Sequence, residues 1–284
     1  MLSKIVVPVR GDGMIEPVLG HASALAMRHN AHIVVAHCRS RTEDLMPYSR
    51  QLPSFARETL TEQARELADQ EEQAVRDQLH RFALSLGLKE TDTPGQGVAS
   101  VEFAEEYGLM ADVIKHIGRL ADLVVVGKPD RDRNLGTNSL KSALFRTGRP
   151  VLMCPPRKDV QPDFGNHITV AWNGSLESSR AVAMTLDIAR TAQSVTILSG
   201  GKGEPHGATA EELVEYYRLR GIAAEIERFD ARNPAEGLLK RTTELGANLL
   251  IMGAYGHNHE RETLFGGNTQ AVVDKAEIPV VLVH

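Results

Sequence analysis

The loop from Gly253 to Thr269 holds the residues whose types and spacing best suit chemistry. Four of its positions are glycine, and two of these open the helix expected next. Glycine lets backbone N–H groups approach a ligand closely, and the N-terminus of a helix carries a partial positive charge that attracts anions. The loop therefore predicts a phosphate-binding site that uses Gly253, Gly256, Gly266 and Gly267.

Other motifs offer weaker chemistry. His257 and His259 lie two residues apart in a polar loop, which is not the helical HExxH spacing of a zinc site, so we interpret them as solvated side chains. Ser175, which follows Asn173 and Gly174, is expected to cap a helix rather than to act as a nucleophile. The sequence has no GxxxxGK(S/T) motif and no GxGxxG after either first strand. We predict no catalytic residue and no metal site.

Composition excludes several classes of protein. The formal net charge of -5 and the aromatic fraction of 5% leave neither a basic field nor stacking platforms for nucleic acid, so we expect no such partner. No apolar run approaches the ~20 residues that cross a bilayer, and the N-terminus lacks a signal-peptide pattern, so we expect a cytoplasmic protein without a membrane segment. Cys38 and Cys154 are expected to be buried, reduced thiols.

The strands and helices that must position the loop occur twice along the chain, as an internal sequence repeat. Residues 121–127, Ala-Asp-Leu-Val-Val-Val-Gly, reappear as residues 247–253, Ala-Asn-Leu-Leu-Ile-Met-Gly, at an offset of 126, and Phe103 falls on Phe229 at that offset. Internal similarity over most of each half indicates a duplicated unit. We expect a first domain over 1–156, a linker over 157–166 and a second domain over 167–284.

Apolar strand-like runs alternate with helical periodicity, which is typical of a parallel sheet covered on both faces. Pro234 should open a helix over 234–245, and the charged segment 54–86 should form a long helix. The short apolar strands that close the two halves should pair with each other, because an unpaired edge invites aggregation. The expected strands are 4–9, 32–37, 98–104, 122–127 and 150–154 in the first half, and 167–172, 194–199, 223–229, 248–253 and 279–283 in the second.

The spacing Gly253-x2-Gly256-x9-Gly266, placed at the end of the fourth strand of a five-stranded unit, resembles the universal stress protein family. The duplication resembles the two-domain members of that family. The resemblance implies two tandem Rossmann-like (flavodoxin-like) α/β domains packed as an internal pseudo-dimer, with pairing of two whole chains left open. It also implies an adenine nucleotide, ATP or AMP with magnesium, as the ligand of the branch that binds one.

Carried over from the family, the four glycines of the loop would wrap the phosphates. Asn268 would supply a backbone N–H and Thr269 a hydroxyl, while Gly200 would lie beside the adenine. Two positions depart from the nucleotide-binding branch. Asn173 replaces an aspartate, and Gly267 replaces a serine or threonine.

The first half departs further from this pattern. Its loop from Gly127 to Gly136 is four residues shorter and lacks the second glycine, and Arg10 takes the aspartate position, so we expect no triphosphate there. The resulting hypothesis is a stress-response protein that senses an adenine nucleotide through its second half. Two alternatives stay open: a protein that binds no nucleotide and acts through a protein partner docked on 54–86, and a slow ATPase.

Overall fold

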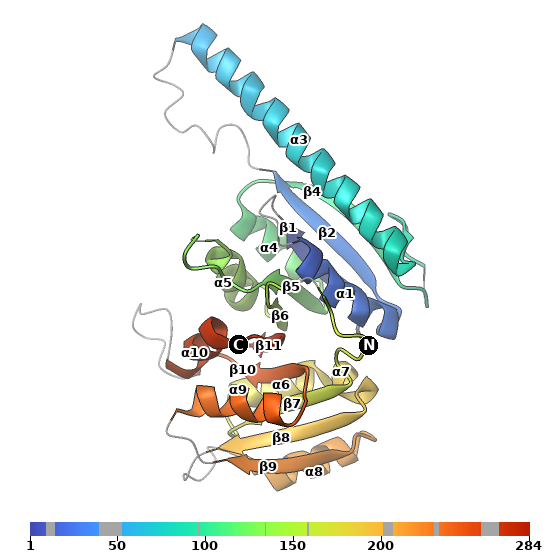
Figure 1. The fold of residues 1–284 in the computed structure, drawn as a ribbon, viewed down its shortest axis with the longest axis vertical. Coiled ribbons are helices and arrows are strands. Elements are labelled where there is room, and N and C mark those ends of the chain that lie inside the picture. The colour runs from blue at the N-terminus through green and yellow to red at the C-terminus, as the bar shows by residue number, and fades with distance from the viewer. Residues whose placement is uncertain are drawn as a thin grey trace.

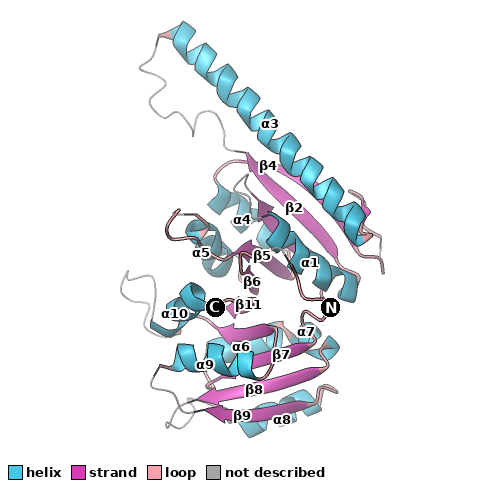
Figure 2. Cartoon of the chain, in the orientation of Figure 1, coloured by secondary structure: helices cyan, strands magenta, loops and turns pink. Residues whose placement is uncertain are grey.

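A computed structural model describes residues 1–9, 15–39, 53–95, 97–133, 135–157, 159–200, 207–229, 233–256 and 267–284. These residues form an α/β structure around one sheet of eleven strands, with helices on both of its faces (Figures 1 and 2). The expected α/β class with a mostly parallel sheet is therefore confirmed. Among the described residues, no helix is both long enough and apolar enough to span a membrane.

The first half of the chain supplies six strands, all parallel to their neighbours within that half. Its elements are, in order, β1 (Lys4–Val9), α1 (Ile15–His29), β2 (His32–Arg39), α3 (Ser54–Leu86), β3 (Lys89–Glu90), β4 (Ser100–Tyr107), α4 (Met110–Gly118), β5 (Leu123–Gly127), α5 (Thr137–Arg146) and β6 (Val151–Cys154).

The second half supplies five strands with the same parallel arrangement. Its elements are β7 (His167–Trp172), α6 (Leu176–Met184), α7 (Leu186–Thr191), β8 (Ser194–Gly200), α8 (Ala210–Arg218), β9 (Ala224–Phe229), α9 (Pro234–Glu244), β10 (Leu249–Gly253), α10 (Gly267–Lys275) and β11 (Val280–Val283). All ten strands expected from the sequence are present, each within three residues of its predicted ends.

The two halves meet through their closing strands. β6 and β11 are antiparallel, with Leu152 opposite Val281, and the sheet order is β3-β4-β2-β1-β5-β6-β11-β10-β7-β8-β9. The predicted pairing of these strands is confirmed, and its consequence is a single continuous sheet rather than two separate ones. Outward from this pair, the order is β6-β5-β1-β2-β4 in the first half and β11-β10-β7-β8-β9 in the second, so equivalent strands of the repeat take equivalent places. The two-residue strand β3, which the sequence did not predict, is the one addition among the described strands.

Alternation along the strands divides the core between the two faces of the sheet. Ile5 and Val7 of β1 face one hydrophobic cluster, whereas Val6 faces the other, and all three are fully buried. Both clusters continue across the β6–β11 junction, to Val281 on one face and Leu282 on the other. Because β11 is buried on both faces, its sequence is continuously apolar.

The segment over residues 155–166 connects the halves and packs against both. Arg28 of α1 donates hydrogen bonds to the backbone oxygen of Phe164 and to Oδ1 of Asn166, each at 2.7 Å. Asn248 accepts a hydrogen bond from the N–H of Gly165 at 2.9 Å. These contacts fix the connection in place, while the expected domain boundaries remain a prediction.

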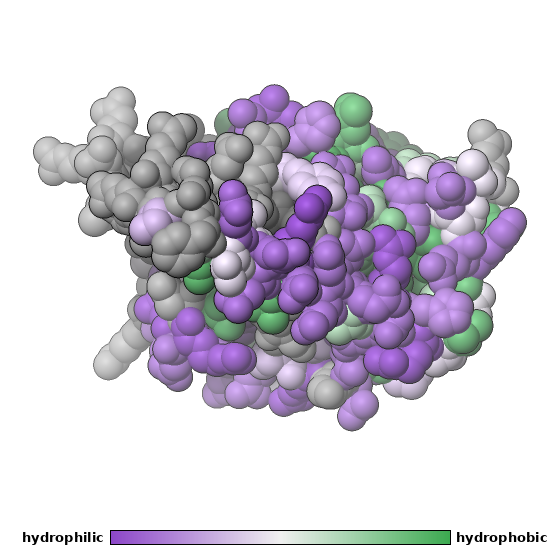
Figure 3. Space-filling view, turned by 90° about the horizontal axis from the view of Figure 1, so that it is seen from above, coloured by the Kyte–Doolittle hydropathy of each residue, from purple (hydrophilic) through white to green (hydrophobic). Residues whose placement is uncertain are grey.

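Helix α3 is the feature that most distinguishes the first half. Its 33 residues match the predicted helix 54–86, and Gly87, in the left-handed conformation at φ +68, ends it. Val75, Leu79 and Ala83 bury one face of its C-terminal part in the core, whereas the N-terminal part extends past the sheet (Figure 1). Seen from this end of the molecule, the described surface is mostly hydrophilic (Figure 3).

Candidate functional site

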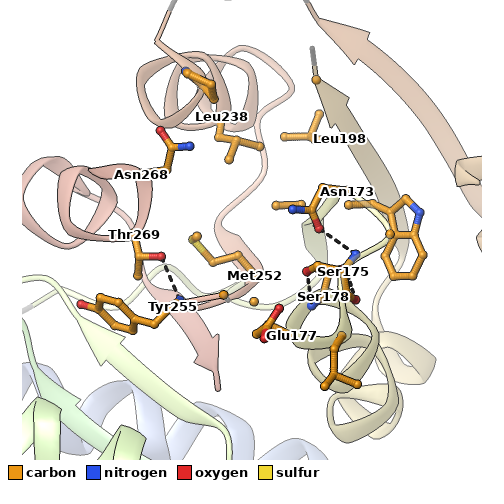
Figure 4. Close-up of a pocket in the computed structure, with 18 of the residues that line it drawn as sticks. Asn173, Ser175, Glu177, Ser178, Leu198, Leu238, Met252, Tyr255, Asn268 and Thr269 are labelled. Carbon is orange, nitrogen blue, oxygen red and sulfur yellow. Dashed lines mark hydrogen bonds between the residues drawn. The ribbon is translucent and has the colours of Figure 1, made fainter. Parts of the chain in front are cut away.

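A cavity of about 970 Å³ opens at the carboxyl ends of β7, β8 and β10, in the second half of the chain. The start of α6, the α9 helix and the start of α10 complete its walls (Figure 4). Ligands of open parallel sheets bind at this edge of the strands. Six of the eight residues predicted for the site line the cavity: Asn173, Gly200, Gly253, Gly256, Asn268 and Thr269.

Of the other two predicted residues, the structure describes one, Gly267. Gly267 is the first residue of this helix and directly precedes Asn268. Gly266 lies outside the described residues, as do Arg10, His257 and His259. The first turn of α10 contains no acidic residue, so its partial positive charge is uncompensated by the helix itself.

Asn173 forms the turn between β7 and α6. Its Oδ1 accepts a hydrogen bond from the N–H of Ser175 at 3.1 Å, and Gly174 between them has a φ of +72. Ser175 Oγ in turn accepts from the N–H of Ser178, which confirms Ser175 as the cap of α6. The amide nitrogen of Asn173 is left on the cavity side (Figure 4).

The cavity has an apolar wall that the sequence analysis did not identify. Gly200 has no side chain because the ring of Phe229 occupies that space: a methyl group at Gly200 would lie 2.5 Å from Cζ of Phe229. Leu198, Leu238 and Met252 extend this wall. The signal available in the sequence was the position of Phe229, an aromatic residue at the end of a predicted strand that matches Phe103 in the repeat.

Glu177 explains part of the glycine spacing. A methyl group at Gly253 would lie 2.6 Å from the backbone N of Ser178 and 2.8 Å from Cβ of Glu177. A methyl group at Gly256 would lie 3.2 Å from Oε2 of Glu177. These two glycines therefore let the start of α6 pack against the end of β10, besides leaving room for a ligand.

Tyr255 and Thr269 join the end of the β10 strand to α10. The N–H of Tyr255 donates to Oγ1 of Thr269 at 3.2 Å. Tyr255 has a φ of +58, which is unusual for a residue with a side chain, and its ring lies 5.2 Å from that of Phe145 in the first half. Burial, with a smaller contribution from Asp274, raises the pKa of Tyr255 to about 12, so its phenol is neutral at physiological pH.

The first half has a smaller cavity of about 630 Å³ at the corresponding edge. Basic side chains line it, and two of them are held by the second half: Lys128 donates to the backbone oxygen of Ala276 at 2.8 Å, and Arg131 pairs with Asp274 at 2.8 Å. Gly136, with a φ of +79, precedes α5 there. The two cavities are thus related by the repeat but differ in size and lining.

Metal-binding groups are sparse in the part of the chain that the structure describes. No cluster of three or more His, Cys, Asp or Glu side chains is arranged there to hold an ion. The 970 Å³ cavity combines an apolar wall, the N-terminus of a helix and several glycines whose backbone a ligand can approach closely. This arrangement suits a ligand with an aromatic ring at one end and an anionic group at the other.

Comparisons with known proteins agree with this architecture. The model of the universal stress protein family matches residues 166–284. Universal stress protein Slr1230 of Synechocystis sp. is 23% identical over 234 residues, which cover 78% of this chain and 79% of that protein.

Solved structures show the same fold. A universal stress protein from Archaeoglobus fulgidus DSM 4304 superposes with a TM-score of 0.74 at 14% identity, covering 100% of this chain and 98% of that one. A protein of unknown function from Pseudomonas aeruginosa PAO1 gives a TM-score of 0.56 at 19% identity, covering 99% and 92%. The match to the universal stress protein family is carried by the second half of the chain, residues 166–284, and the relative of similar length extends the similarity over both halves.

Proposed function

We propose that this protein binds an adenine nucleotide, ATP or AMP, in the 970 Å³ cavity of its second half, and that it acts as a nucleotide sensor in a cytoplasmic stress response. The observation that carries the proposal is the convergence of six predicted residues, from β7, β8, β10 and α10, on one cavity. The family supplies the class of ligand, and the cavity supplies a place that fits it.

The base would lie against the apolar wall. Phe229, Leu198 and Leu238 offer an aromatic and aliphatic surface beside Gly200. Stacking of a base on an aromatic side chain contributes ~1–3 kcal/mol and depends little on which base it is. Selection of adenine would therefore come from the backbone around the end of β8 rather than from Phe229.

The phosphates would lie at the opposite end, between Gly256 and the first turn of α10. Asn268 and Thr269 present backbone N–H groups and a hydroxyl at the helix terminus that favours negative charge. Two positions lack a group that the nucleotide-binding branch has: Asn173 carries no charge where a carboxylate would meet the ribose or a metal, and Gly267 has no hydroxyl for the phosphates. Affinity for ATP should consequently depend on the helix terminus and the loop more than on these two side chains.

A second function, action through a protein partner without nucleotide, is favoured by one observation. The N-terminal part of α3 extends beyond the sheet, and Leu60 and Leu67 are 40% and 58% exposed on it (Figure 1). This alternative becomes the better account if the second-half cavity takes up no nucleotide.

Native mass spectrometry and calorimetry distinguish these two functions. A folded chain purified from cells should carry the additional mass of an adenine nucleotide, and the emptied protein should release heat on titration with ATP and magnesium. Titration with CTP should give a weaker signal, because only the contacts to the base differ. Absence of both retained nucleotide and titration heat would contradict the proposal.

A further inference from the structure

The first-half cavity, of about 630 Å³, has an apolar floor that the proposed function does not use. The floor consists of Val9 at the end of β1, Ile15 and Val18 of α1 and Val126 of β5, each at most 5% exposed. None of the described residues that line this cavity is aromatic. The floor therefore suits an aliphatic group better than the flat ring of a base.

Side chains also take up the place that would correspond to the bare end of β8 in the second half. β1 and β7 open the two copies of the repeat, and β2 and β8 pair with them in the same register, so that Cys38 takes the place of Gly200. The thiol of Cys38 donates to Sδ of Met110 at 3.1 Å. A nucleotide base therefore lacks in the first half both the aromatic wall and the open position that Gly200 provides in the second.

The charged side chains that line the first-half cavity differ in their exposure. Lys128 and Lys141 are half-buried, whereas Asp130 and Asp132 are exposed. Water and salt screen exposed charges more than half-buried ones, so the lysines contribute most to the field inside the cavity. Lys128 donates to the carbonyl oxygen of Ala276 at 2.8 Å, and this neutral partner leaves its positive charge in place.

Contacts within the chain fix the rim of this cavity. Asp130 and Leu135 exchange two backbone hydrogen bonds, at 3.0 and 2.9 Å, and Arg131 forms an ion pair with Asp274 of α10 at 2.8 Å. The loop then ends at Gly136, where α5 begins with no acidic residue in its first turn. A rim that is already ordered costs little entropy when a ligand binds.

We propose that the first-half cavity binds a small aliphatic acid, with its hydrocarbon part on Val9, Ile15 and Val18 and its carboxylate beside Lys128. The carboxylate gains a charge-assisted hydrogen bond from the ammonium group, and the hydrocarbon part gains by leaving water. This site lies in the other half from the proposed nucleotide site, takes a different class of ligand and does not depend on whether ATP binds.

Calorimetric titration of octanoate into the full chain tests the proposal, with octanol and acetate as matched probes. We expect octanoate to bind more tightly than either by about tenfold or more, because octanol lacks the charge and acetate lacks the hydrocarbon part. Lys128→Gln keeps a polar side chain without its charge, so it should weaken octanoate binding about tenfold and leave octanol binding unaltered. Lys89→Gln, on β3 at the far edge of the sheet, should bind octanoate as the parent does.

Three results would overturn the proposal: no binding of octanoate by the parent, equal affinities for octanoate and octanol, or a Lys128→Gln variant with the affinity of the parent. Weaker octanoate binding by Asn268→Asp, which changes the second-half cavity, would place the acid there and overturn it as well. Failure of the parent to bind ATP contradicts the proposed function alone. A melting curve of each variant without ligand verifies that the substitution has not unfolded the chain.

Discussion

Oγ1 of Thr269 accepts a hydrogen bond from the backbone N–H of Tyr255 at 3.2 Å, and this contact joins α10 to the residues that follow β10. Both residues are buried, at 7% and 6% exposure. Tyr255 holds a left-handed backbone conformation there, and its ring packs on Phe145 of the first half. The shape of the candidate site is therefore set by a few buried contacts around the start of α10.

Replacing Thr269 by valine should destabilise the chain, because it leaves the buried N–H of Tyr255 without an acceptor. An unsatisfied buried donor costs about 1–3 kcal/mol. Thr269→Ser retains the hydroxyl and should lose less stability than Thr269→Val. Urea unfolding curves of the parent and both variants measure the difference, and a valine variant as stable as the parent would show that this contact contributes nothing.

Replacing Gly267 by serine should strengthen the binding of ATP. Apart from its chain neighbours, no described atom lies within 4 Å of a methyl group placed at Gly267, so the side chain meets no steric obstacle there. A hydroxyl in the first turn of α10 adds a donor to the phosphates, and a hydrogen bond to a charged group contributes about 1.5–3 kcal/mol. Calorimetry should detect a dissociation constant at least several-fold lower, whereas an unchanged or higher value would place the phosphates elsewhere.

Replacing Phe229 by leucine should weaken ATP binding but leave tripolyphosphate binding unaltered. The leucine keeps the apolar wall and removes the aromatic ring that packs over Gly200. The loss for ATP should be about 1–3 kcal/mol, as for other bases that stack on a side chain. Competition between the two ligands in one titration is the measurement, and an equal loss for both would mean that Phe229 supports the site rather than the base.

The sequence predicted the elements of the fold well because the signals for them are local. Periodicity and burial on both faces located all ten main strands, and the 126-residue repeat located the cavity edge. The continuous sheet follows from one long-range strand pairing, of β6 with β11. The local sequence indicates only that each of these edge strands needs a partner, not which strand that partner is.

The parts of the site that the sequence missed are those set by packing. Glu177 is an ordinary acidic residue in the first turn of a helix until Gly253 and Gly256 bring the β10 strand against it. Phe229 is an ordinary strand residue until it covers Gly200. The motif spacing identified the glycines of the site. Which side chains pack against those glycines can be seen only in the tertiary structure.

When the pH drops below about 6.5, the stability of the folded chain should decrease because of His21. The ring is buried, donates through Nδ1 to the backbone oxygen of Pro17 at 2.7 Å and lies edge-on to Phe164. Burial lowers the pKa of His21 more than the hydrogen bond to Pro17 raises it. The folded pKa is thus below the unfolded value, so the unfolded chain takes up the proton first and stability is lost as the pH falls.

The variant His21→Leu should show a smaller drop in melting temperature between pH 7.5 and pH 5.5 than the parent. Some dependence should remain, because burial also lowers the pKa values of His29 and His32. Melting curves across this pH range make the comparison. A variant with the full pH dependence of the parent would mean that His21 is protonated as easily in the folded chain as in the unfolded one.

The matched pair Asn268→Asp and Asn138→Asp tests most directly whether the second-half cavity is the nucleotide site. Both residues are exposed, and each is the second residue of its helix, α10 or α5, at equivalent positions of the repeat. An acidic residue in the first turn favours the helix in both cases, so neither change should unfold the chain.

Calorimetric titration with ATP and magnesium on the parent and on these two variants is the decisive measurement. The account predicts that Asn268→Asp loses about tenfold in affinity, equivalent to about 1.4 kcal/mol, through repulsion of the phosphates. It predicts that Asn138→Asp binds as the parent does. A loss confined to Asn138→Asp, or equal losses in both variants, would contradict a single site in the second half.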